Sequence, residues 1–107
     1  MYTLEFSKLY DIDVDISYNY IKNNLESPMA ANNLIKNILE KLDKIKKNPY
    51  IRPFVQDKYL ALLGFRSINV KNYSIFYIIK EERKYIKIIR FLHNKKNWIN
   101  ILKDNDI

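Results

Sequence analysis

The segment at residues 73–80 constrains the fold of this 107-residue chain more than any other. Its side chains alternate with the two-residue period of a β-strand, and both alternating sets are apolar. One set consists of Tyr73, Ile75, Tyr77 and Ile79, and the other of Phe76 and Ile78. A strand that is apolar on both faces lies in the middle of a sheet and is covered on both sides. The rest of the chain must therefore supply its neighbours and its cover.

Two more strands flank this central one in the sequence. Residues 65–71 precede it, and we place a tight hairpin turn at Lys71-Asn72 because asparagine tolerates a positive φ. Residues 81–84 form a second turn, and residues 85–92 form the last strand. That strand is also apolar on both faces, with Ile86, Ile88 and Leu92 opposite Ile89 and Phe91. The pattern predicts a three-stranded antiparallel meander.

The first half of the chain predicts one strand and two helices. Residues 2–7 alternate as a short strand, and residues 11–26 are helical, with Asp11 or Asp13 available as the cap. Ser27 and Pro28 begin a second helix that runs to about residue 47. Its apolar stripe consists of Ala31, Leu34, Ile35, Ile38, Leu39, Leu42 and Ile45. The short linker makes the two helices an antiparallel hairpin.

The remaining segments complete the predicted architecture. A loop with one helical turn near residues 57–62 precedes the meander, and a basic exit loop at residues 93–96 follows it. Residues 98–103 form a short C-terminal helix anchored by Trp98, although an exposed aromatic could instead stack on a base. We expect the acidic end beyond this helix to be frayed.

Helices followed by a run of strands are typical of an α+β fold with helices on one face of the sheet. We therefore predict a single α+β domain over residues 1–107. It contains an N-terminal strand, an antiparallel helical hairpin, a three-stranded antiparallel meander and a short C-terminal helix.

Composition limits the chemistry available to this chain. The absence of cysteine excludes disulfides, thiol catalysis and cysteine-based zinc sites, and a single glycine excludes glycine-rich phosphate loops. Aspartates at positions 11, 13 and 15 resemble the opening of a calcium loop. However, Ile16 and Lys22 stand where that loop needs its glycine and its bidentate glutamate. We expect no metal ion and no cofactor.

The net charge of +7 indicates a polyanion or an acidic protein as partner, and a solvated basic surface explains it equally well. The N-terminus is too acidic and polar for a signal peptide. Lysine or arginine interrupts every long apolar run before it reaches membrane-spanning length. We expect a cytoplasmic protein with no membrane partner.

Three motifs occur in order along the chain. Residues 23–42 contain N-x-x-x-P-x-A-A-x-x-L-x-x-x-I-x-x-x-L, residues 64–77 read G-F-R-x-x-x-V-x-N-Y-x-I-F-Y, and residues 88–93 read I-x-R-x-L-H. A basic, aromatic tail follows. This ordered set resembles the RelE/ParE superfamily of bacterial type II toxins over nearly the whole chain. The resemblance implies a toxin that an antitoxin encoded beside it holds inactive until stress or plasmid loss releases it.

Two mechanisms occur in this superfamily. RelE-like members are metal-independent endoribonucleases that cut mRNA in the ribosomal A site, and ParE-like members lack that activity and poison DNA gyrase. The endonucleases supply lysine and arginine from the sheet, with a C-terminal tyrosine or histidine. Arg66 matches one of their basic positions, but Ser74 and Asn94 stand where they place two arginines. The pattern at residues 90–93 and the long hairpin look more like the ParE branch.

If the chain is RelE-like, its candidate catalytic residues are Arg66, Arg90, His93, Lys95 and Lys96. RNA cleavage by 2′-OH attack needs groups that accept a proton, donate one and neutralise the phosphorane, and histidine titrates near neutrality. Each candidate has a structural alternative. The two arginines could pair with acids such as Glu5 or Asp57, and the histidine could simply be a hydrogen-bonding residue after a strand. The two lysines are the best candidates for contact with a polyanion.

The resemblance leaves three hypotheses for function. We favour the toxin of an addiction or plasmid-stabilisation module that inhibits DNA gyrase in the ParE-like manner. The alternatives are a RelE-like, ribosome-dependent mRNA interferase and a degenerate, non-toxic binding module, so whether the chain is an enzyme depends on this choice. As partner we expect an acidic antitoxin that lies across the sheet edge and the groove beside the hairpin, forming a toxin–antitoxin hetero-oligomer.

Overall fold

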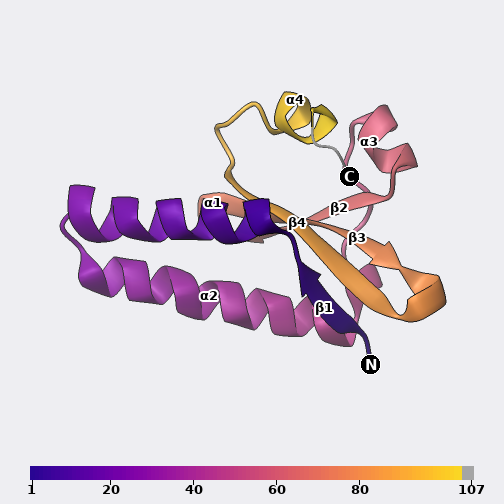
Figure 1. Cartoon of the computed structure of the whole chain (residues 1–107), viewed down its shortest axis with the longest axis horizontal. Coiled ribbons are helices and arrows are strands. Elements are labelled where there is room, and N and C mark those ends of the chain that lie inside the picture. The colour runs from indigo at the N-terminus through magenta and orange to yellow at the C-terminus, as the bar shows by residue number, and fades with distance from the viewer. Residues whose placement is uncertain (105–107) are drawn as a thin grey trace.

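The computed structural model describes residues 1–104 and confirms the predicted α+β fold (Figure 1). The main elements in chain order are β1 (Thr3–Phe6), α1 (Lys8–Asn19), α2 (Pro28–Lys47), α3 (Lys58–Leu62), β2 (Phe65–Val70), β3 (Tyr73–Lys80), β4 (Tyr85–His93) and α4 (Trp98–Lys103). A π-helical turn, Tyr20–Asn24, prolongs α1, and 3₁₀ turns occupy Pro49–Ile51 and Glu81–Arg83. The predicted frayed end falls on residues 105–107, outside the described residues. Within residues 1–104, no helix combines the length and apolar character that a membrane span requires.

The sheet has four strands in the order β1-β4-β3-β2. The predicted meander is confirmed, because β2 pairs antiparallel with β3 and β3 pairs antiparallel with β4. The N-terminal strand joins it by pairing parallel with β4, the last strand in the sequence. Each strand of the meander except β2 therefore has a neighbour on both sides, and β3 lies inside the sheet as its two apolar faces require.

Helices cover both faces of the sheet. One core cluster lies under the α1–α2 hairpin and includes Leu34, Ile38, Leu42, Ile45, Ile75, Tyr77 and Ile88. A second cluster lies under α3 and α4 and includes Leu60, Phe65, Phe76, Ile78, Ile89, Leu92 and Leu102. The expectation of helices on one face is therefore wrong for the two short helices. They cover the apolar face of β3 that points away from the hairpin.

The second helix begins as predicted, with Ser27 as its cap and Pro28 in its first position. Its apolar stripe is confirmed except at Leu39, which is 60% exposed and lies outside the core. The predicted helical turn before the meander is α3, whose cap is Asp57. The capping signal is therefore correct for α2, and the helical turn near residues 57–62 is confirmed.

The first helix begins three residues earlier than predicted, and neither Asp11 nor Asp13 is its cap. Ser7 caps it instead by accepting a hydrogen bond from the backbone N–H of Tyr10 at 3.0 Å. The hydroxyl of Ser7 also donates to the carbonyl of Ile89 at 2.6 Å. The helix starts where β1 leaves the sheet, so the boundary depends on pairing with β4, which is distant in sequence.

A β-bulge in β4 changes which of its residues face the hairpin. Two consecutive residues of β3 pair with Arg90 and Ile88, so β4 carries one extra residue, Ile89, between them. An extra residue reverses the alternation of the strand beyond it. Phe91 therefore joins Ile88 under the hairpin, and Leu92 joins Ile89 on the other face. The predicted grouping of Leu92 with Ile88 is wrong for this reason.

The turn between β2 and β3 is where we predicted it, but a different residue takes the unusual backbone conformation. Lys71 has a φ of +58°, and the predicted residue, Asn72, does not have a positive φ. The left-handed region is open to any L-residue at a modest cost, so a tight hairpin can impose it on lysine.

A single glutamate connects three distant parts of the chain. Glu81, in the turn between β3 and β4, accepts hydrogen bonds from the hydroxyls of Tyr2 (2.7 Å) and Tyr50 (2.6 Å) and pairs with Lys84. The hydrogen bonds from Lys84, Tyr50 and Tyr2 lower the pKa of Glu81 to about 2. The same carboxylate raises the pKa of both tyrosines.

We expect Glu81→Gln to make the fold less sensitive to acid. Because the pKa in the folded chain lies below the ordinary 4.5, the carboxylate stabilises the fold above pH 4.5, and this contribution is lost as the pH falls towards 2. Urea unfolding at a series of pH values in this window should give a shallower fall in the free energy of unfolding for the variant. Glu82→Gln, an exposed neighbour in the same turn, is the matched control and should keep the original slope. Parallel profiles for all three proteins would contradict the prediction.

Candidate functional site

Three of the predicted site residues line one groove. His93, at the end of β4, lies beside Lys95 and Lys96 in a groove of about 450 Å³ between α1 and the end of the strand. The other residues that line it are Asp13, Ile16, Ser17, Tyr20, Tyr73, Phe91 and Leu92. We call this the basic groove. Its floor is largely apolar, and its cations come from the loop that follows β4.

The histidine shapes the loop that carries the two lysines. His93 belongs to β4, so the exit loop starts one residue later than predicted. Its Nδ1 atom accepts a hydrogen bond from the backbone N–H of Lys95 at 3.1 Å, and its carbonyl accepts one from Lys96 at 3.0 Å. Its ring packs edge-on against Tyr73, with 5.1 Å between ring centroids. These contacts hold both lysines at the rim of the basic groove.

Arg90 is engaged by an acid from the first helix. Its Nε and Nη2 atoms donate to the two carboxylate oxygens of Asp13 at 2.6 and 2.8 Å. The same carboxylate accepts the backbone N–H of Phe91 at 3.1 Å, next to the bulge. The side chains of Arg90 and Asp13 are only 15% and 11% exposed. The alternative of an ion pair is therefore right for Arg90, but the partner is Asp13 rather than Glu5 or Asp57.

This arrangement has a clear physical cause. A bulge interrupts the regular ladder and leaves a backbone N–H that needs another acceptor. Asp13 supplies that acceptor and neutralises the adjacent guanidinium through a bidentate, charge-assisted pair. Sequence reasoning missed this role of Asp13, because its partners lie 77 and 78 positions away in the chain.

Arg66 lies away from the basic groove. Arg66, in β2, pairs with Tyr77 on one side of β3. His93, in β4, pairs with Tyr73 on the other side of β3. Four residues of strand separate these two positions, which corresponds to about 13 Å along β3. Arg66 donates to the carbonyl of Arg52 at 2.5 Å.

Two exposed aromatic rings accompany Arg66 at this edge of the sheet. Its guanidinium lies 4.1 Å from the centroid of Phe54 and 5.1 Å from that of Tyr50. Sequence reasoning treated these rings as part of an irregular loop. The available signal was the run of aromatic and basic residues around Pro53, which carries no periodicity.

Ser74 and Asn94, which the sequence resemblance aligns with two arginines of RelE-like endonucleases, lie side by side. The hydroxyl of Ser74 donates to the side-chain oxygen of Asn94 at 2.6 Å, and the amide nitrogen of Asn94 donates to Asn69 at 2.9 Å. The backbone N–H of Asn94 also donates to the carbonyl of Asn72 at 2.8 Å. A neutral hydrogen-bonded network therefore occupies this part of the surface.

Trp98 anchors the C-terminal helix, as the structural interpretation predicted. Its ring stacks on Phe76, with 5.3 Å between centroids, and it packs against the core cluster under α3 and α4.

In the described part of the chain, no three His, Asp or Glu side chains are grouped as a metal ion would require. The polar groups of the basic groove are the imidazole of His93, the ammonium groups of two lysines, the hydroxyls of Ser17, Tyr20 and Tyr73 and the paired carboxylate of Asp13.

Comparisons with known proteins agree with this fold. A family model described as "ParE toxin of type II toxin-antitoxin system, parDE" matches residues 4–98. A solved structure titled "Chromosomal ParDE TA system from P. aeruginosa" is similar at 19% identity and a TM-score of 0.69, covering 87% of this chain and 96% of that one. The toxin–antitoxin complex RelBE2 from Mycobacterium tuberculosis is similar at 17% identity and a TM-score of 0.45, covering 86% and 96%. The first likeness supports the fold, and the second is too distant to support an argument. No curated protein matches the chain.

Proposed function

Because this chain belongs to the ParE toxin family of type II toxin–antitoxin systems, we propose that it is the toxin of such a module and that it inhibits DNA gyrase. Family membership agrees with the three motifs in its sequence. We also propose that residues 1–107 form one toxin domain, that a cognate antitoxin neutralises it, and that the module stabilises a plasmid or responds to stress. Gyrase as the target implies action in the cytoplasm.

The observation that carries this proposal is the neutral network of Ser74, Asn94 and Asn69. Ser74 and Asn94 bond to each other at 2.6 Å, and both stand at positions where RelE-like endonucleases place arginines. Cleavage of RNA by its own 2′-OH develops extra negative charge on the phosphorane, and fixed cations must stabilise it. A hydroxyl and an amide carry no such charge, which favours a non-hydrolytic toxin.

The remaining candidate cations also favour this choice. The charge of Arg90 is paired with the carboxylate of Asp13, and Arg66 lies on the far side of β3 from the basic groove. His93 supplies the imidazole of that groove, with Lys95 and Lys96 beside it. Efficient cleavage needs one group to accept a proton and another to donate one. Because these three residues still share a groove, the RelE-like alternative is retained as the second candidate.

We propose that the antitoxin binds through an acidic segment in the basic groove. His93, Lys95 and Lys96 would meet its carboxylates, while Phe91 and Tyr73 would receive its apolar side chains. Among the described residues, β1 is an edge strand of the sheet, whereas the outer edge of β2 is partly occupied by the bridge between Phe54 and Arg66. An extended antitoxin segment could therefore add a strand beside β1. The product would be a toxin–antitoxin hetero-oligomer.

A pair of assays distinguishes the two targets. Purified toxin is expected to block ATP-dependent supercoiling of relaxed plasmid by DNA gyrase. At the same dose, ribosomes stalled on a defined mRNA should yield unchanged RNA 5′ ends by primer extension. Toxin neutralised by its antitoxin is the matched control and should leave supercoiling intact.

Cuts at the A-site codon that disappear in His93→Ala and Lys96→Ala would overturn the proposal and establish the RelE-like alternative. Normal growth of cells that express the chain without antitoxin, together with intact mRNA and unimpaired gyrase, would instead identify a degenerate binding module. Each outcome therefore selects one of the three hypotheses.

A further inference from the structure

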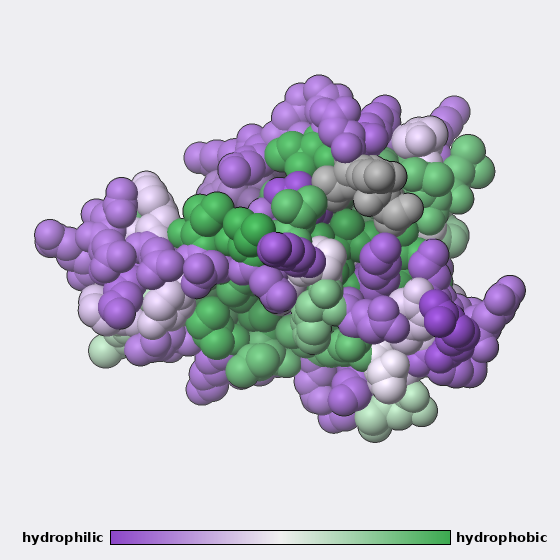
Figure 2. Space-filling model, viewed as in Figure 1, coloured by the Kyte–Doolittle hydropathy of each residue, from purple (hydrophilic) through white to green (hydrophobic). Residues whose placement is uncertain are grey.

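The first helix presents an apolar ridge to solvent, away from the core. It consists of Leu9, Ile12, Ile16 and Tyr20, whose exposed fractions are 45%, 43%, 63% and 50%. The spacing of three and four residues places these side chains along one side of α1 and the π-helical turn that prolongs it, turned away from the buried residue Tyr10. Figure 2 shows hydrophobic surface over α1 with hydrophilic surface around it. We call these four residues the α1 ridge.

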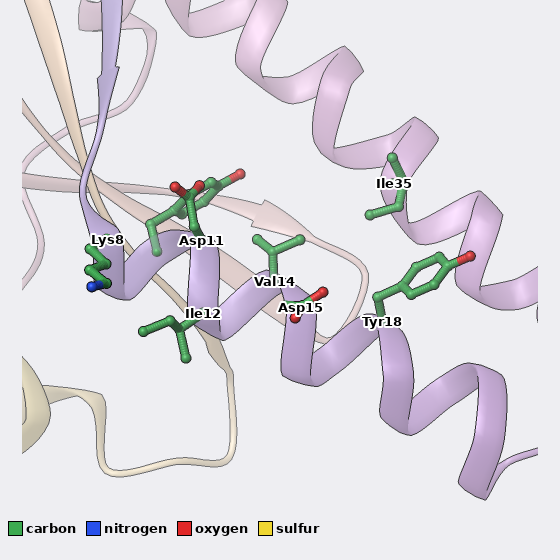
Figure 3. A pocket seen from close by; sticks show the side chains of 8 residues that line it. Lys8, Asp11, Ile12, Val14, Asp15, Tyr18 and Ile35 are labelled. Carbon is green, nitrogen blue, oxygen red and sulfur yellow. The ribbon is translucent and has the colours of Figure 1, made fainter.

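An acidic groove runs along one flank of the ridge. It has a volume of about 730 Å³ and lies between α1 and α2, with Val14, Tyr18 and Ile35 among its lining residues. Figure 3 shows Val14 and Tyr18 directed towards Ile35 of α2, while Ile12 points away from α2. The exposed carboxylates of Asp11 and Asp15 line this groove, with Lys8 at its N-terminal end. We call it the acidic groove.

The basic groove runs along the other flank. Ile16 and Tyr20 of the ridge line it, and its exposed charges are those of Lys95 and Lys96, with His93 beside them. The one carboxylate on that side, Asp13, is already paired with Arg90. The ridge therefore has free negative charge on one side and free positive charge on the other.

We propose that the α1 ridge is the interface of a homodimer that the chain forms without other partners. A two-fold axis along the direction of the helix would bring two α1 helices together in parallel. That operation places the acidic groove of each copy opposite the basic groove of the other, and each contact occurs twice. An antiparallel pair would instead place like charges opposite each other, which disfavours association.

A second copy fits this surface better than an acidic partner does. A segment with only negative charge would complement the basic groove and be repelled by Asp11 and Asp15. A copy of this chain carries both charges in the required arrangement and supplies its own apolar ridge. Exposed apolar rows on a small protein are typical of association surfaces.

Light scattering after size-exclusion chromatography tests the proposal on the free, full-length chain made by cell-free synthesis. Over a concentration series, the unchanged chain should approach twice its 13.0 kDa mass, and Ile16→Glu should remain at 13.0 kDa. Leu62→Glu is the matched control, because Leu62 is 87% exposed on α3, away from the ridge, and this variant should still form the dimer. Circular dichroism identifies any variant that has failed to fold.

A charge exchange tests the electrostatic contacts between the flanks of the two copies. Asp11→Lys with Asp15→Lys makes both flanks basic, and Lys95→Glu with Lys96→Glu makes both acidic, so each double variant alone should be monomeric. Their mixture should form a dimer, because both contacts are then complementary. A monomeric unchanged chain at all concentrations, a dimeric Ile16→Glu protein or a mixture that fails to associate would each overturn the proposal. The proposal requires neither gyrase nor antitoxin.

Discussion

Replacing Asp13 by alanine is expected to lower the free energy of unfolding by about 3 kcal/mol, near the lower end of the loss for breaking a buried ion pair. The change removes both bonds to the guanidinium of Arg90 and the acceptor for the backbone N–H of Phe91. Both charged side chains are mostly shielded from water, so the guanidinium would be left buried without this counterion. Urea denaturation followed by circular dichroism measures the loss.

Asp15→Ala is the matched control for this change. Asp15 occupies the same helix half a turn away, but its side chain is exposed and lines the acidic groove. Its removal should change the free energy of unfolding by less than about 0.5 kcal/mol, as is usual for a surface substitution. Equal losses for Asp13→Ala and Asp15→Ala would show that the carboxylate at the bulge has no special role in stability.

Phe91→Ala is expected to cost about 3–5 kcal/mol, the usual range for truncating a buried phenylalanine. Phe91 is 1% exposed, and its ring stacks on Tyr73 at 4.8 Å and meets the edge of Tyr10 at 6.3 Å. The change removes one apolar ring from the floor of the basic groove and a packing contact between α1 and β4. The midpoint of thermal unfolding should fall accordingly.

Phe54→Ala provides the comparison, because it removes the same ring from an exposed position. Phe54 is 51% exposed and contacts the guanidinium of Arg66, so its loss should cost no more than about 1 kcal/mol. Thermal unfolding of both variants in the same buffer measures the difference. If Phe54→Ala were the more damaging change, the core under the hairpin would not be the main source of stability near the groove.

The β-bulge connects these two predictions with the proposed function. If residues 88–93 alternated regularly with no bulge, Phe91 would point towards α4, and His93 would leave the side of the sheet that α1 covers. The bulge therefore places an apolar floor and a histidine in the same groove. Asp13 satisfies the backbone group at the bulge and neutralises Arg90, so stability and the shape of the groove depend on the same contacts.

The sequence by itself determined the order and type of the elements, because those depend on neighbouring residues. The apolar alternation of β3 predicted a central strand, and Ser27-Pro28 predicted the start of α2. Both are local signals in which side-chain period or a cap acts within a few positions. The ordered motifs also indicated the toxin family, which the family model confirms over residues 4–98.

Only the tertiary structure decided the cap of α1, the bulge and the composition of the site. Ser7 became the cap because β1 pairs with β4, and Asp13 became the partner of Arg90 across 77 positions. The five candidate site residues separated in the same way: three line the basic groove, Arg90 is paired with Asp13, and Arg66 lies across β3. One added residue in a strand reverses every side chain after it. That reversal arises from pairing between strands, so no local pattern in the sequence could reveal it.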